Sequence, residues 1–168
     1  MGPPLRAAAA FGIRYRPERE DDLPFLAALY ASARGREFAG LGWPPEMLSA
    51  FLGQQFDAQH RFYRARFPAA EWLIVEAEDA AIGRLAVERR ESSLHLIDIA
   101  LTPERRGGGL GGAILADLID EAEALELPLS LQVDHANPAR RLYERLGFRT
   151  LEARPPYEWM ERPRAAGA

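Results

Sequence analysis

The sequence predicts a mixed α/β domain in which helices cover the faces of one β-sheet. Strand-like and helix-like periodicities alternate along the chain, which is typical of this class. One predicted strand, residues 94–101, is apolar on both faces, as expected of a buried central strand. The chain has 168 residues, no internal repeat and no long linker, which fits one domain large enough to bury a core.

The first half of the chain is predicted to supply three strands and two helices. Ile13 and Tyr15 alternate with arginines, which indicates a short strand. The acidic pair Asp21 and Asp22 precedes apolar residues at helical spacing, and this predicts the start of the first helix. The remaining elements follow in order as a loop at 40–45, a long helix at 46–66, and strands at 72–75 and 81–87.

The second half is predicted to supply four more strands and two helices. The helix at 110–125 has its apolar positions on one face, and its acidic residues, among them Asp117, are expected to face away. Asn137 and Pro138 suit the start of a short helix that runs to Leu146. The strands are expected at 94–101, 129–133, 148–151 and 157–160. We expect residues 11–162 to form the domain, with flexible ends at 1–10 and 163–168.

Composition excludes several classes of function. The net charge of −4 argues against a general nucleic-acid binder, which usually carries a basic balance. Without cysteine there can be no disulfide and no thiolate metal site, and the three histidines show no ligand spacing, so we predict no metal. No apolar run is long enough to span a bilayer, and residues 1–10 are too weak for a signal peptide. We therefore expect a cytoplasmic protein that binds neither nucleic acid nor membrane.

The glycine-rich segment that joins the strand at 94–101 to the next helix predicts a phosphate site. Glycines at 107–109, 111 and 112 let the backbone approach a ligand closely and direct its N–H groups toward it. The helix N-terminus adds a partial positive charge, and Arg105 and Arg106 can add full charges.

Two other kinds of phosphate loop fit this segment less well. A P-loop needs Gly-Lys-Ser or Gly-Lys-Thr, which the sequence lacks. Gly107, Gly109 and Gly112 do match the dinucleotide pattern G-x-G-x-x-G, with Asp134 at about the expected distance of roughly 20 residues. However, five residues separate the strand from Gly107, and too little chain follows to complete a dinucleotide-binding fold. A redox or nucleotide-binding domain that binds NAD stays as an alternative.

Two blocks of the sequence resemble the cofactor motifs of the GNAT superfamily of N-acetyltransferases. Arg106, Gly109 and Gly111 match the pyrophosphate loop Arg/Gln-x-x-Gly-x-Gly/Ala. The stretch from Asn137 to Phe148 resembles the second motif, Asn…Leu-Tyr-x-x-x-Gly-Phe. The resemblance implies a mostly antiparallel sheet of about seven strands with a splayed parallel pair, and about four flanking helices. It also implies acetyl-CoA as the acyl donor and makes a homodimer an expectation.

The resemblance further implies a set of cofactor-binding residues. Backbone amides of the loop would hold the pyrophosphate, and backbone groups of the central strand would pair with the pantetheine arm. The set is Ile99, Leu101, Arg105, Arg106, Gly107, Gly108, Gly109, Leu110, Gly111, Gly112, Asn137 and Tyr143.

Acetyl transfer to an amine needs a base for the amine and an acid for the leaving thiolate. By analogy with the family Tyr143 would be the acid, although it also lies on an apolar helix face and could belong to the core. Asp98 is the candidate base, because it interrupts an apolar strand and burial would raise its pKa. A structural ion pair with an arginine is the alternative for Asp98. His95 would lie on the opposite face if the strand is regular.

The acceptor site is expected across the sheet from the cofactor, near the first two helices. Trp43, Gln55, Gln59 and Tyr63 are the candidates to line it, with ordinary helix packing as the alternative. The aromatic and amide mix suits a small amine or a peptide N-terminus. The sequence thus predicts transfer of an acetyl group from acetyl-CoA to a primary amine, and a catalytically silent acyl-CoA sensor remains the alternative.

Overall fold

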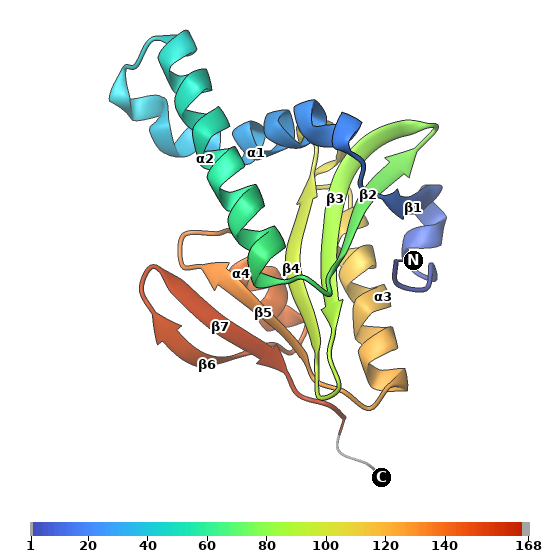
Figure 1. Cartoon of the computed structure of the whole chain (residues 1–168). Coiled ribbons are helices and arrows are strands. Elements are labelled where there is room, and N and C mark those ends of the chain that lie inside the picture. Colours follow the sequence, from blue (N-terminus) through green and yellow to red (C-terminus); the bar gives the residue numbers. More distant parts are fainter. Residues whose placement is uncertain (1, 166–168) are drawn as a thin grey trace.

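The computed structural model describes residues 2–165 and shows one seven-stranded sheet with helices on both faces (Figure 1). The strand order is β1-β2-β3-β4-β5-β7-β6, which places β4 at the centre, as its apolar pattern predicted. Only β4 and β5 run parallel, and every other neighbouring pair is antiparallel. The predicted mixed α/β class and the predicted parallel pair are therefore confirmed.

The elements lie close to their predicted positions. The strands are β1 (Ile13–Pro17), β2 (Glu71–Ala77), β3 (Ala80–Arg89), β4 (Leu94–Leu101), β5 (Leu129–Asp134), β6 (Arg149–Arg154) and β7 (Tyr157–Arg162). The α-helices are α1 (Leu23–Phe38), α2 (Pro45–Arg66), α3 (Leu110–Ala124) and α4 (Arg140–Arg145). Short 3₁₀ turns occur at Ala8–Phe11, Glu20–Asp22, Ala39–Leu41 and Pro103–Arg105.

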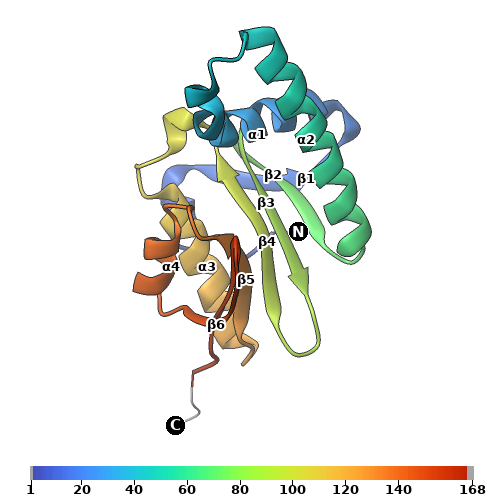
Figure 2. The ribbon, with the colours of Figure 1, turned by 90° about the vertical axis from the view of Figure 1, so that its left-hand side faces the viewer.

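The two faces of the sheet are covered differently. α3 and α4 pack on one face and form the main core, in which Ile114, Leu118 and Leu85 are fully buried (Figure 2). α1 and α2 lie over the other face, where two smaller apolar clusters form around Phe56 and around Phe67. The α1–α2 layer is thus held by less apolar contact, and a cleft is left between it and the central strands.

The parallel strands β4 and β5 separate along their length. They pair only at Leu94–Leu129, His95–Ser130 and Leu96–Leu131. Beyond Leu96 the edge of β4 that faces β5 has no strand partner, so its backbone polar groups need another partner. The splay predicted for this pair is present.

A β-bulge in β4 changes which residues share a face. Ala86 of β3 lies opposite Asp98, but its neighbour Val87 lies opposite Leu96, so Ile97 is an extra residue. An extra residue reverses the alternation of side chains beyond it. His95 and Asp98 therefore both line the cleft on the α2 side, and the expectation that they lie on opposite faces is wrong because the strand is not regular.

The N-terminal segment is ordered by a buried carboxylate. Backbone N–H groups of Arg6, Ala7 and Ala8 donate to Asp117 on α3 at 3.1, 2.6 and 3.1 Å. Ala8 is fully buried and Asp117 is only 1% exposed. Asp117 thus does not face away as expected, and residues 6–8 are held against α3 because this carboxylate accepts hydrogen bonds from their N–H groups.

At the other end, residues 163–165 of the predicted flexible segment 163–168 are exposed and lie outside any strand or helix. Residues 166–168, and Met1 of the N-terminal segment, lie outside the described residues. Within residues 2–165, no helix combines the length and the apolar character needed to cross a membrane.

Candidate active site

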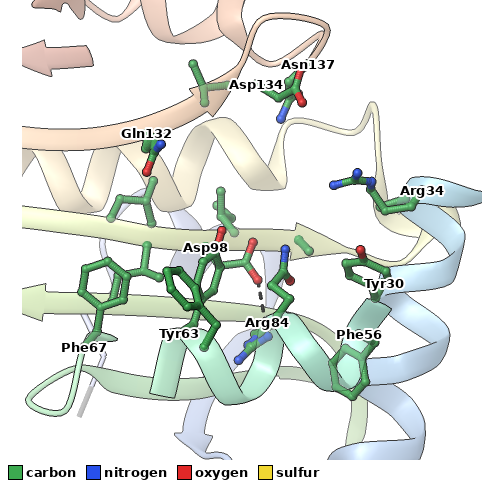
Figure 3. A pocket seen from close by; sticks show the side chains of 18 of the residues that line it. Tyr30, Arg34, Phe56, Tyr63, Phe67, Arg84, Asp98, Gln132, Asp134 and Asn137 are labelled. Atoms are coloured by element: carbon green, nitrogen blue, oxygen red, sulfur yellow. Dashed lines mark ion pairs between the residues drawn. The ribbon is translucent and has the colours of Figure 1, made fainter. Parts of the chain in front are cut away.

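A cleft of about 750 Å³ opens between the α1–α2 layer and the splayed strands (Figure 3). Its floor is β4 from His95 to Ala100, and its sides come from α1, α2, β5 and β7. The splay of β4 and β5 creates this space, because two strands that paired along their whole length would leave no gap for a ligand.

The glycine-rich loop leads from the end of β4 into α3. Gly107 and Gly109 have φ angles of +74° and +91°, a region that residues with a side chain adopt only with strain. Gly109 is the residue before α3, so the loop ends directly at a helix N-terminus. Within residues 2–165, no acceptor takes a hydrogen bond from the backbone N–H groups of residues 107–112. These groups can bind an anion without giving up a partner.

Arg106 holds the loop in place. Its Nε donates to the carbonyl oxygen of Leu101 at 2.9 Å, and its Nη2 donates to Ser32 Oγ of α1 at 2.9 Å. The predicted cofactor-binding arginine therefore ties the loop to β4 and α1. Arg105 is exposed beside it.

The open edge of β4 and the loop fit a long, pyrophosphate-containing ligand. Ile99 and Leu101 lie on the unpaired part of β4, so their backbone is not engaged by β5. Gly83 of β3 lies opposite Leu101, and a Cβ at Gly83 would come within 2.5 Å of the Ala100 carbonyl oxygen. A glycine is thus required there for β3 and β4 to approach as closely as they do.

Asp98 lies at the centre of the cleft (Figure 3). Its side chain is 30% exposed, and its Oδ2 lies 3.6 Å from Arg84 Nη1. Burial raises the pKa of Asp98 above its ordinary value, and the charge of Arg84 opposes that rise. The raised pKa that we expected of a base and the arginine partner that we gave as the alternative thus both occur at this carboxylate.

Arg84 is a residue that the sequence analysis missed. It is only 4% exposed and lines the cleft, with its Nε 3.4 Å from Glu18 Oε2 and its guanidinium 4.8 Å from the centre of the Trp72 ring. Its Nε and Nη2 make no hydrogen bond to any described residue. The sequence did contain a signal for Arg84, because it is the one charged residue in the apolar stretch 81–87. Asp98 is likewise the one charged residue in β4.

Tyr143 is buried on α4, where its ring packs 5.6 Å from that of Phe148. Burial raises the pKa of Tyr143 to about 12, and the nearby charge of Asp98 adds to the effect. The core position that the sequence offered as an alternative is therefore real. This buried position is compatible with a role as acid, because the Tyr143 hydroxyl keeps its proton at neutral pH.

Asn137 lies at the rim of the cleft, in the turn before α4 (Figure 3). Its Oδ1 accepts a hydrogen bond from Ala139 N–H at 2.9 Å. The α-helix itself begins three residues later, at Arg140, so Asn137 shapes the turn that leads into it.

The acceptor candidates are only partly brought together. Gln55, Gln59 and Tyr63 of α2 all line the cleft. Trp43 is not among its lining residues, because its ring packs 6.3 Å from Phe38 and 5.3 Å from Phe51. The structure therefore assigns Trp43 to the junction of α1 and α2 and not to the cleft.

Comparisons with known proteins agree with this geometry. A family model for the acetyltransferase (GNAT) family matches residues 28–148, well over half of the chain. The fold is similar to that of PaiA N-acetyltransferase from Thermoplasma acidophilum in complex with coenzyme A, at 17% identity and a TM-score of 0.66, covering 90% of this chain and 98% of that one.

Two further solved structures share the fold. One is a histone acetyltransferase HPA2 and related acetyltransferase from Corynebacterium glutamicum, at 22% identity and a TM-score of 0.64, covering 93% of this chain and 98% of that one. The other is the ribosomal-protein-S18-alanine N-acetyltransferase from Escherichia coli, at 23% identity and a TM-score of 0.60, covering 92% of this chain and 96% of that one. With the family model matching across the loop, the central strand and α4, the chain belongs to the GNAT family of acetyltransferases.

Proposed function

We propose that this acetyltransferase moves the acetyl group of acetyl-CoA onto a primary amine, by direct attack of the amine while both substrates are bound. GNAT acetyltransferases use acetyl-CoA, which agrees with the cofactor predicted from the glycine-rich loop. The observation that carries the proposal is the position of Asp98. This carboxylate has a raised pKa and lies in the cleft that follows the open edge of β4.

The cofactor side of the cleft would bind acetyl-CoA mainly through the backbone. The free N–H groups of residues 107–112 suit the pyrophosphate, and the unpaired edge of β4 around Ile99 and Leu101 suits the amide-containing pantetheine arm. When bound, acetyl-CoA supplies an acetyl group activated as a thioester. Arg106 positions the loop through Leu101 and Ser32.

Asp98 is proposed to take the proton from the incoming ammonium group. A base works best when its pKa lies near the working pH, and burial moves the pKa of Asp98 in that direction. Arg84 keeps the carboxylate charged by opposing the rise. Tyr143 is proposed to give its hydroxyl proton to the leaving thiolate, since a pKa of about 12 keeps that proton available.

The amine is proposed to reach Asp98 from the side of α2. Gln55, Gln59 and Tyr63 line this side, and the small molecule or peptide that carries the amine would contact them. The acidic, cysteine-free composition supports a cytoplasmic enzyme that does not bind nucleic acid. A homodimer remains part of the proposal, to be checked by light scattering.

The test is a calorimetric titration with acetyl-CoA and with NAD, followed by a thiol-release assay over a panel of primary amines. We expect heat with acetyl-CoA alone, and release of CoA only when an amine is present. Binding of acetyl-CoA without amine-dependent release from any member of the panel would favour the acyl-CoA sensor. Heat with NAD and none with acetyl-CoA would contradict the cofactor assignment.

A further inference from the structure

An unbroken row of aromatic rings lines the end of the cleft that lies away from the glycine-rich loop. We name Tyr63, Phe67, His95 and Trp159 the aromatic wall. The ring centres lie 6.1 Å apart from Tyr63 to Phe67, 5.5 Å from Phe67 to His95, and 5.3 Å from His95 to Trp159. All four residues line the cleft, and they come from α2, the residue after α2, β4 and β7.

From this juxtaposition we infer that the acceptor is an arylalkyl primary amine, a flat aromatic ring joined by a short alkyl chain to the reacting nitrogen. The inference rests on the proposed function and specifies its substrate class. A ring on the aromatic wall gains stacking and edge-to-face contacts that an aliphatic chain of similar size cannot make.

The aromatic wall begins next to the proposed base. Tyr63 lies beside Asp98 in the cleft (Figure 3), where burial raises the pKa of Tyr63 to about 12 and the charge of the Asp98 carboxylate adds to the rise. An amine held at Asp98 therefore has an aromatic surface within a short chain length. Because the bulge at Ile97 turns His95 and Asp98 to the same side of β4, the aromatic wall and the carboxylate line the same cleft.

The aromatic wall carries no charge of its own near neutral pH. His95 is 2% exposed, and burial lowers its pKa to about 4, so the ring stays neutral. Its Nδ1 is engaged with Ser130 Oγ at 2.9 Å, which fixes the ring in its stacked position against Trp159, at an angle of 11° between the planes.

The balance of charge in the cleft disfavours a polyamine. Three arginines line it, namely Arg34, Arg66 and Arg84, against two carboxylates, Asp98 and Asp134. A ligand with several positive charges would need additional carboxylates, and it would meet like charges instead. A monoamine with an apolar body needs one carboxylate, and Asp98 provides it.

The experiment compares three probes at saturating acetyl-CoA: 2-phenylethylamine, hexylamine and spermidine. We expect kcat/KM to be at least about 10-fold higher for 2-phenylethylamine than for hexylamine, since aromatic contacts on the wall act on one probe alone. Equal or faster transfer to hexylamine or spermidine would overturn the inference and leave the amine acetyltransferase intact. If none of the three probes releases CoA but another primary amine of the panel does, the inference fails and the proposed function stands. If no amine of the panel releases CoA, the proposed function fails, and the inference fails with it.

A matched pair of variants locates the effect. Trp159→Leu removes a half-buried ring of the aromatic wall, whereas Trp43→Leu makes the same change outside the cleft. For Trp159→Leu we expect KM for 2-phenylethylamine to rise about 3- to 10-fold, with KM for hexylamine and the Kd of acetyl-CoA almost unchanged. An equal rise for both amines, or the same result with Trp43→Leu, would contradict recognition by the wall. If the Trp159→Leu variant does not fold, the comparison of the three probes on the unchanged protein still tests the inference.

Discussion

The two halves of the proposed site are built from different parts of the chain. The proposed cofactor half uses consecutive residues, the loop at 106–112 and the end of β4, and it presents mostly backbone groups. The acceptor half presents side chains from α1, α2, β4 and β7, which are far apart in the sequence. A backbone site demands glycine at fixed spacing, whereas a side-chain site demands only that the fold bring the residues together.

Because one half depends on backbone conformation and the other on side chains, substitutions can alter one half of the site without altering the other. The cofactor half is constrained by φ angles and by close approach, so few substitutions are compatible with it. The acceptor half consists of exchangeable side chains on a common framework, and its chemistry can vary without altering the loop.

The largest expected effect is at Gly109, which tests whether the cofactor half is a backbone site. Gly109→Glu places a side chain at a φ of +91°, and a Cβ there would lie 3.6 Å from Phe11 Cζ. It also adds negative charge beside the N–H groups proposed to hold the pyrophosphate. We expect binding of acetyl-CoA to weaken at least about 100-fold, which corresponds to about 2.7 kcal/mol.

The control for this variant is Gly42→Glu. Gly42 has a similar left-handed φ of +64° and lies just before α2, in a different loop, so it repeats the strain and the charge away from residues 107–112. Calorimetry on both folded proteins should show loss of binding only for Gly109→Glu. Unchanged affinity in folded Gly109→Glu would remove the loop from the cofactor site.

This contrast also explains what could be predicted from the sequence. The loop, Asn137 and Tyr143 could be proposed as site residues because their motifs are local. Asp98 could be proposed because one charge in an apolar strand is conspicuous, and Arg84 carried the same signal. The bulge at Ile97 could not be predicted, because it depends on the pairing of β3 with β4 and no local residue type requires it.

The next effect concerns the rate of transfer and not cofactor binding, and it is expected at Asp98. Asp98→Asn removes the proposed base and keeps the shape of the side chain, so transfer should slow by about 10²- to 10⁴-fold with the affinity for acetyl-CoA unchanged. The unchanged enzyme should also lose activity as the pH falls through the raised pKa of Asp98, since the base must be deprotonated. The measurement is kcat/KM between pH 5 and pH 9.

Stability provides an independent check on Asp98. Because its pKa is raised in the folded state, ionised Asp98 costs stability as the pH rises through that pKa. The Asn variant lacks this cost and should be at least as stable as the unchanged protein at pH 8. Asp57→Asn, on the exposed surface of α2, serves as the control and should keep full activity. Full activity of Asp98→Asn would contradict the role of Asp98 as base, and the ion pair with Arg84 would then be its only role.

A smaller effect is expected at Tyr143, which separates a core tyrosine from a proton donor. Tyr143→Phe keeps the ring against Phe148 and removes the hydroxyl, so acetyl-CoA should still bind while transfer slows by about 10- to 100-fold. Tyr15→Phe is the matched control, because Tyr15 is another tyrosine with a raised pKa but lies on β1, at the edge of the sheet, and its hydroxyl has no hydrogen-bond partner among the described residues. Equal rates for both variants would assign Tyr143 to packing and move the proton source elsewhere.

The smallest effect on activity at neutral pH is expected at His95, and its readout is stability in acid. The pKa of His95 is about 4 in the folded protein and about 6.5 when unfolded, so the unfolded chain takes up a proton first as the pH falls. The contribution of His95 to the free energy of unfolding is therefore complete above about pH 7. It declines as the pH falls, and at about pH 4 the free energy of unfolding has dropped by roughly 3 kcal/mol. Urea unfolding at pH 7.5, 5.5 and 4.5 should show this decline, and His95→Phe, which keeps an aromatic ring between Phe67 and Trp159, should show a smaller one. An identical decline in both proteins would mean that His95 is already able to take up a proton when folded, and the aromatic wall would then gain a positive charge in mild acid.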